Sequence, residues 1–139
     1  MRTWLSLMAV LVLVVCSSCK THLKNDVDTY PGGSVLGMGG NVERPEGTLF
    51  RIKQVAGDGP RTVAEHFRKT LVEGKGWTEE SGAGFIFRQG KMRVPSVTDF
   101  TDPNIGPEDP NEAAGYVLVA EASNQTYIYI LRYVPKPKK

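Results

Sequence analysis

The strongest structural signal in the chain is a pair of β-strand patterns near its C-terminus. Residues 115–122 and 126–134 are rich in β-branched and aromatic side chains, and three polar residues separate them. Two such runs joined by a short polar connection predict a β-hairpin. The last third of the chain is therefore expected to form antiparallel β structure.

A further strand and a helix are predicted upstream. Residues 48–56 alternate apolar and charged side chains, which indicates a half-buried strand. In residues 60–73, Val63, Phe67 and Leu71 recur every four positions, which is typical of an amphipathic helix. Shorter strand patterns follow at residues 77–80, 83–89 and 91–97.

This order of elements predicts an α+β fold, in which one amphipathic helix packs on a mostly antiparallel sheet in two layers. The strand–helix–strand meander is expected over residues 47–134. Residues 19–46 are polar and glycine-rich, so they are predicted to form a lipidated N-terminus and a flexible tether. Residues 135–139 form a basic tail.

The first 18 residues predict a signal peptide. Arg2 precedes an uncharged apolar stretch of 12 residues, whereas a membrane-spanning helix needs about 20. The following Ser17-Ser18-Cys19 resembles the lipobox of bacterial lipoproteins, with Cys16 where the pattern has Leu. That resemblance implies cleavage before Cys19 and a diacylglycerol on its thiol. The alternatives are an ordinary signal peptide, cleaved after Ser18 or nearby, and an uncleaved anchor.

A longer pattern is similar to bacterial lipoproteins of unknown function. It consists of Y-P-G, a strand, D-x-P-x-x-V-x-x-F followed by L and G-W, and a β meander. The residues that carry it are Tyr30, Pro31, Gly32, Asp58, Pro60, Val63, Phe67, Leu71, Gly76 and Trp77. The chain departs from the pattern at Arg68, where the pattern has Tyr, and in a longer proline-rich insertion. The resemblance implies a location at the cell membrane or outer membrane, facing periplasm or exterior, and implies no reaction.

Charge and motif content argue against several functions. The 17 Lys and Arg residues nearly balance the 15 Asp and Glu residues, so no basic footprint for nucleic acid is expected. Both cysteines lie at the N-terminus, and His66 is the only histidine in the predicted domain. With no pair of metal ligands and no G-x-S-x-G motif, neither a metal, a cofactor nor an enzymatic activity is predicted.

Two candidate sites remain. The first candidate is a binding site for a protein partner on the loop over residues 98–114. Its acidic and amide side chains are Asp99, Asp102, Asn104, Glu108, Asp109 and Glu112. The second candidate is a pocket between helix and sheet, lined by Phe67, Trp77, Phe85 and Tyr116. The predicted function is a membrane-anchored envelope lipoprotein that acts as a non-enzymatic binding or assembly module. The alternative is a domain that binds a small molecule or lipid.

Overall fold

The computed structural model describes residues 23–36, 40–82, 84–95 and 102–137. Within them, strands hold 48% of the residues and helices 15%. The predicted α+β class is therefore wrong, because the protein is mostly antiparallel β sheet with one short helix. Among the described residues the strands are β1 (Gly33–Leu36), β2 (Val42–Arg44), β3 (Gly47–Ala56), β4 (Thr78–Ser81), β5 (Phe85–Gln89), β6 (Met92–Arg93), β7 (Gly106–Pro107), β8 (Ala114–Ala122) and β9 (Gln125–Pro135).

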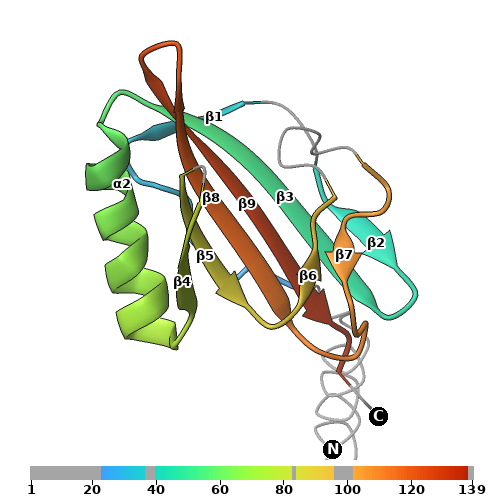
Figure 1. Cartoon of the computed structure of the whole chain (residues 1–139). Coiled ribbons are helices and arrows are strands. Elements are labelled where there is room, and N and C mark those ends of the chain that lie inside the picture. Colours follow the sequence, from blue (N-terminus) through green and yellow to red (C-terminus); the bar gives the residue numbers. More distant parts are fainter. Residues whose placement is uncertain (1–22, 37–39, 83, 96–101, 138–139) are drawn as a thin grey trace, which may run out of the picture.

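Seven of these strands form one antiparallel sheet (Figure 1). Its order is β1-β3-β9-β8-β5-β4, and β2 pairs with the same edge of β3 as β1. The last strand in the sequence, β9, therefore lies between β3 and β8, and it pairs with each along most of its length. β4 forms the opposite edge of the sheet.

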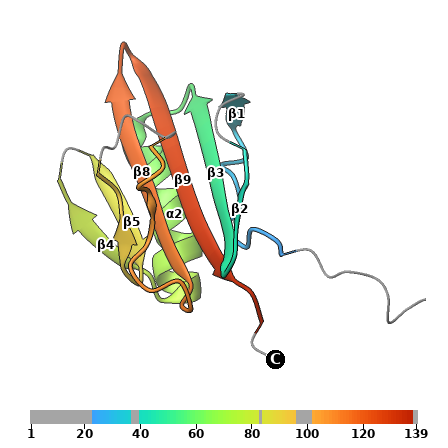
Figure 2. The ribbon, with the colours of Figure 1, turned by 90° about the vertical axis from the view of Figure 1, so that its right-hand side faces the viewer.

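Helix α2 (Pro60–Phe67) continues as the π-helical segment Arg68–Glu73 and covers one face of the sheet. In Figure 2 it lies behind the strands. Pro60 occupies the first helical turn, where its missing N–H costs nothing, and Gly59 is the N-cap. No helix among the described residues is long and apolar enough to cross a membrane.

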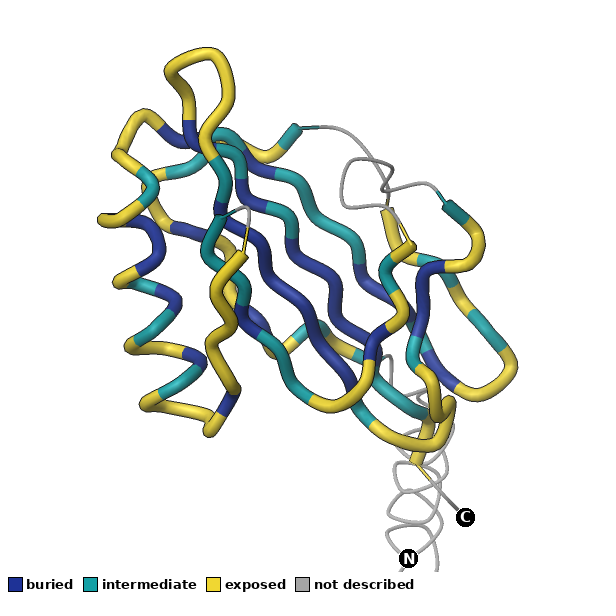
Figure 3. The backbone as a smooth tube through the Cα atoms, viewed as in Figure 1, coloured by how far each residue is buried: buried dark blue, intermediate teal, exposed yellow. Residues whose placement is uncertain are grey.

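The two-layer prediction fails because both faces of the central strands are apolar. In β8, the six residues Ala114–Val119 are all buried, where a strand with one wet face would alternate. Val117 and Val119 pack on the helix side with Phe67, whereas Leu118 packs on the other side. Figure 3 shows this burial along the central strands.

Part of the second face is covered by the small β6–β7 sheet. These two strands pair with each other and not with the main sheet. Met92 of β6 and the fully buried Ile105, just before β7, pack on Leu131 and Tyr133 of β9. The loop predicted over residues 98–114 thus contributes Ile105 to a second hydrophobic core.

The described part of the predicted tether is not free, so that part of the prediction is wrong. Val27 and Tyr30 are 3% and 8% exposed and belong to the helix-side core. The buried Gln54 side chain accepts a hydrogen bond from the Tyr30 N–H (2.8 Å) and donates one to the Tyr30 carbonyl (3.0 Å). β1 and β2 then add to the sheet, so ordered structure begins well before Gly47.

The predicted C-terminal hairpin is confirmed. β8 and β9 pair in register from Ala122↔Gln125 to Ala114↔Tyr133. Ser123 and Asn124 form the turn with φ of 53° and 63°. Two adjacent residues with positive φ give the turn that matches the right-handed twist of the paired strands.

Candidate functional site

The four residues of the predicted pocket do not line one cavity. Phe67, Trp77 and Phe85 belong to the helix-side core, but Tyr116 lies on the opposite face of the sheet. Phe67 and Trp77 are 0% and 3% exposed. The Trp77 ring lies so close to Gly115 that a Cβ there would come within 2.2 Å of it. The space between helix and sheet at these positions is filled by side chains.

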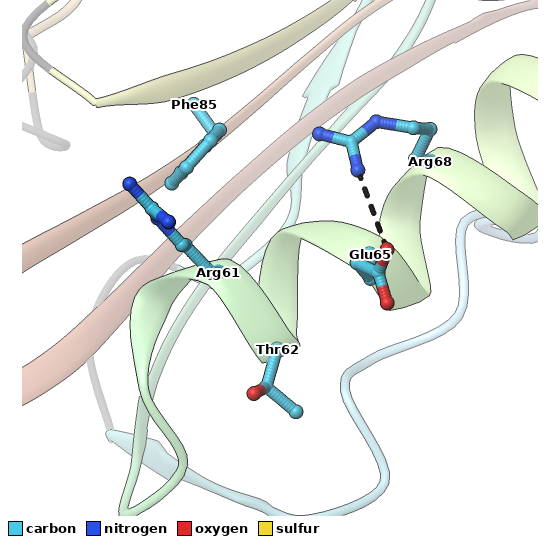
Figure 4. A pocket seen from close by; sticks show the side chains of 5 residues that line it. All are labelled: Arg61, Thr62, Glu65, Arg68 and Phe85. Carbon is cyan, nitrogen blue, oxygen red and sulfur yellow. Dashed lines mark ion pairs between the residues drawn. The ribbon is translucent and has the colours of Figure 1, made fainter.

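A surface groove of about 520 Å³ does lie at the edge between α2 and β5 (Figure 4). Phe85 is the only predicted pocket residue that lines it; the others are Arg61, Thr62, Glu65 and Arg68. Arg68 donates two hydrogen bonds of 2.8 Å to Glu79, which raises the pKa of Arg68 and lowers that of Glu79. Its charge is thereby neutralised within the protein, which leaves Arg61 as the cation available in this groove.

The predicted acidic loop is divided in the structure. Glu108, Asp109 and Glu112 line a second groove, of about 490 Å³, together with Lys91. Asp102 and Asn104 do not line that groove; they form a local turn, in which the Asp102 carboxylate accepts a hydrogen bond from the Asn104 N–H (2.8 Å). Asp99 lies outside the described residues.

This loop is attached to the domain at several points. The Glu108 N–H donates to the Lys91 carbonyl (2.9 Å), and the Tyr133 hydroxyl donates to the Pro110 carbonyl (2.7 Å). Burial raises the pKa of Tyr133, in keeping with a covered hydroxyl. The carboxylates do not form a metal site: within the described ranges, no group of three or more His, Cys, Asp or Glu could hold a metal ion.

A half-exposed aromatic and basic surface lies on the sheet face opposite α2, toward the β8–β9 hairpin. We call it the tyrosine face; its members are Arg51, Lys53, Val55, Ile86, Ala120, Tyr127 and Tyr129, all half-buried. Lys53 Nζ is 5.4 Å from the Tyr127 ring centroid and 5.2 Å from that of Tyr129. β3 and β9 hold these side chains together because Lys53 pairs with Tyr129 and Val55 with Tyr127.

Sequence reasoning identified the strands of the tyrosine face but not the face itself. The available signal was the alternation in residues 127–130, where tyrosines take one side of the strand and isoleucines the other. Deciding which side stays accessible requires knowing that β6 and β7 cover only the half of this face near Tyr133.

A second unpredicted feature is a buried arginine. Arg132 is 6% exposed, and it donates hydrogen bonds of 2.7 and 3.0 Å to the Asp26 carboxylate. It also donates to the Gln89 side chain, and its guanidinium lies 5.5 Å from the Trp77 ring centroid. We call Asp26, Trp77, Gln89 and Arg132 the Arg132 cluster. Lys75 also contacts Asp26, because its ammonium donates a hydrogen bond to the Asp26 carbonyl.

Comparison with protein families, with curated proteins and with solved structures found no match for this chain. Its own residues therefore supply the evidence for what it does.

Proposed function

We propose that the chain is a cell-envelope lipoprotein, anchored in the membrane by a diacylglycerol on Cys19, whose domain acts as a non-enzymatic binding module. The lipobox-like sequence supports the anchor. The binding role rests on the tyrosine face, which presents aromatic rings and cations on a rigid sheet. Tyrosine and arginine are enriched at protein interfaces, and charged side chains there steer the encounter.

The charges of the tyrosine face favour an acidic partner protein. Within the described chain, Lys53 has no acidic partner and contacts two tyrosine rings instead. On the same side of the sheet, Glu80 is already paired with Arg88 at 2.9 Å. Lys53 therefore supplies a positive charge beside apolar and aromatic area.

A binding role is also favoured over catalysis by the titratable groups. Catalytic sites tend to gather groups with perturbed pKa values in one cleft. Here the described groups with shifted pKa values are the paired Arg68 and Glu79 and three tyrosines, Tyr30, Tyr116 and Tyr133, and the pair and the tyrosines do not share one cleft. Each shift has a structural cause, either burial or a single paired neighbour. The alternative of a small-molecule or lipid pocket has less support, because side chains fill its predicted location.

The anchor is tested by comparing Cys19→Ala with Cys16→Ala. Cys19→Ala should move the protein out of the membrane fraction, because the acyl chains supply most of its affinity for the membrane. Cys16→Ala should leave it there, because that residue departs with the signal peptide. A Cys19→Ala protein that resists a salt wash, together with a wild-type mass that shows no lipid, would refute the anchor.

The binding face is tested by crosslinking and capture from membranes with two sets of variants. Lys53→Glu and Tyr127→Ala should each weaken partner capture about tenfold or more, the size typical of an interface hot spot. The control is the triple variant Glu108→Gln/Asp109→Asn/Glu112→Gln. It removes the negative charges of the acidic groove and should leave capture of the partner unchanged. Loss of capture in the control alone would place the interface on the acidic loop instead.

A further inference from the structure

The start of the described chain is held firmly against the domain. Asp26 is bonded to Arg132 through both carboxylate oxygens, and Val27 is 3% exposed in the helix-side core. The chain before Asp26 therefore leaves the domain at a fixed place, next to the end of β9. A flexible tether cannot begin after this point.

The distance from this fixed place to Cys19 is bounded by the chain itself. Seven residue steps separate Cys19 from Asp26. A fully extended chain spans at most about 3.6 Å per residue, so this connection can reach at most about 25 Å. A lipid on Cys19 would thus keep this end of the domain within about 25 Å of the membrane surface.

We infer that the end of the domain formed by Leu23, the Arg132 cluster and the last residues of β9 is a membrane-facing surface, and that its partner is the lipid headgroup layer. This inference rests on the proposed anchor at Cys19. It assigns an orientation: the β8–β9 hairpin points away from the membrane. Figure 1 shows that hairpin at the opposite end of the sheet from the C-terminal end of β9.

Electrostatics contribute little to this orientation. Lys24, Lys75 and Lys136 are exposed around the Arg132 cluster, but Glu46 and Glu73 are exposed nearby and offset most of that charge. The carboxylates of the acidic groove lie at this same end of the sheet, because the groove residue Ala114 pairs with Tyr133 of β9. Charge therefore gives this end no attraction to anionic lipid. The fixed Asp26 and the limited length of the chain before it favour this end facing the lipid, so the orientation is expected on vesicles of neutral lipid.

The geometry gives a sharp experiment with two labelled positions. Eight residue steps separate Arg132 from Asn124 along β9 and its turn, which is about 26 Å at 3.3 Å per residue. A cysteine introduced by Lys136→Cys or Asn124→Cys can be labelled selectively, because Cys19 is blocked by lipid and Cys16 is removed. The full-length lipidated protein is reconstituted in vesicles that carry a headgroup quencher. Fluorescence at position 136 should be quenched several-fold more than at position 124.

The outcomes separate this inference from the proposed function. If mass spectrometry finds no diacylglycerol on Cys19, both fail. If the lipid is present and the two labels are quenched equally, or position 124 more, the anchor stands and the orientation is refuted. Asp26→Asn, introduced into both labelled proteins, should reduce the difference in quenching between positions 136 and 124, because it weakens the attachment of the chain to Arg132. Should Asp26→Asn unfold the domain, the comparison in the wild-type background still decides.

Discussion

Asp26→Ala removes the carboxylate that neutralises Arg132 and leaves the guanidinium in place. Arg132 is 6% exposed, so the cation stays buried, hydrogen-bonded to Gln89 and beside the Trp77 ring. Removing one member of a buried ion pair typically costs 3–5 kcal/mol, whereas an exposed pair contributes about 0–1 kcal/mol. Because the Asp26 side chain is 52% exposed, we expect an intermediate loss of about 2 kcal/mol.

The informative comparison is with Arg132→Met. This substitution removes the buried charge and retains much of the apolar stem, so the double variant Asp26→Ala/Arg132→Met should be more stable than Asp26→Ala alone. Urea unfolding measures each free energy, with Trp77 as the probe, because it is the only tryptophan outside the predicted signal peptide. The matched control is Asp28→Ala, an exposed carboxylate two positions along the same segment. An Asp26→Ala loss no larger than that of Asp28→Ala, or strictly additive effects, would refute the account of the Arg132 cluster.

Three further changes test the core and its attachments. Phe67→Ala should cost about 3–5 kcal/mol in urea unfolding, because its ring is fully buried between α2 and the sheet; a loss under 1 kcal/mol would mean that the helix face is misassigned. Gly115→Ala should cost about 1–3 kcal/mol, because the new methyl would force Trp77 to move. The control is Gly57→Ala, where the new methyl meets open space and the melting temperature should fall little. Equal melting temperatures for the two variants would contradict this packing. The Tyr30 hydroxyl donates a hydrogen bond to the Asp58 carboxylate, which raises the folded-state pKa of Tyr30. The stabilisation from this hydrogen bond is therefore complete below about pH 10 and is lost as the pH rises through the raised pKa. Tyr30→Phe should therefore flatten the alkaline fall in unfolding free energy, and an unchanged slope would argue against this role.

The parts of the fold that depend on local periodicity could be predicted from the sequence. Two runs rich in β-branched and aromatic residues, joined by a short polar connection, predicted the hairpin, and the four-residue recurrence around Phe67 predicted the helix. The class was missed because burial on both faces of β8 was not inferred. Its unbroken apolar run was a usable sign, since a strand covered on both sides shows no alternation.

The glycines before β3 were misread because glycine serves two different purposes. Their density suggested a flexible tether, but Gly33 opens β1, where a Cβ would come within 2.8 Å of the Gln54 amide. Gly33 is therefore explained by the close approach of the Gln54 side chain to the backbone, and not by a need for flexibility. The loop predicted over residues 98–114 contains the short strand β7, which includes Pro107, because proline is tolerated in a short edge strand.

The candidate sites depended on contacts that no local pattern encodes. Asp26 and Arg132 are separated by 106 positions, and their pairing follows from the path of the chain along α2. Likewise, the tyrosine face requires β3 and β9 to be neighbours, although most of the domain separates them in sequence. The acidic residues Glu108, Asp109 and Glu112 could be grouped from the sequence because they lie within five positions.

The central position of β9 determines when the protein can fold. β9 is made last, yet β3 and β8 are each paired with it over nine or more residues. Until residue 135 is available, β3 has only the short β1 and β2 as partners, and the two halves of the sheet remain unjoined. Long-range pairing of this kind delays folding until the whole chain is present. For a chain exported as proposed above, such a delay would be an advantage, because β9 would emerge on the far side of the membrane after β3 and β8.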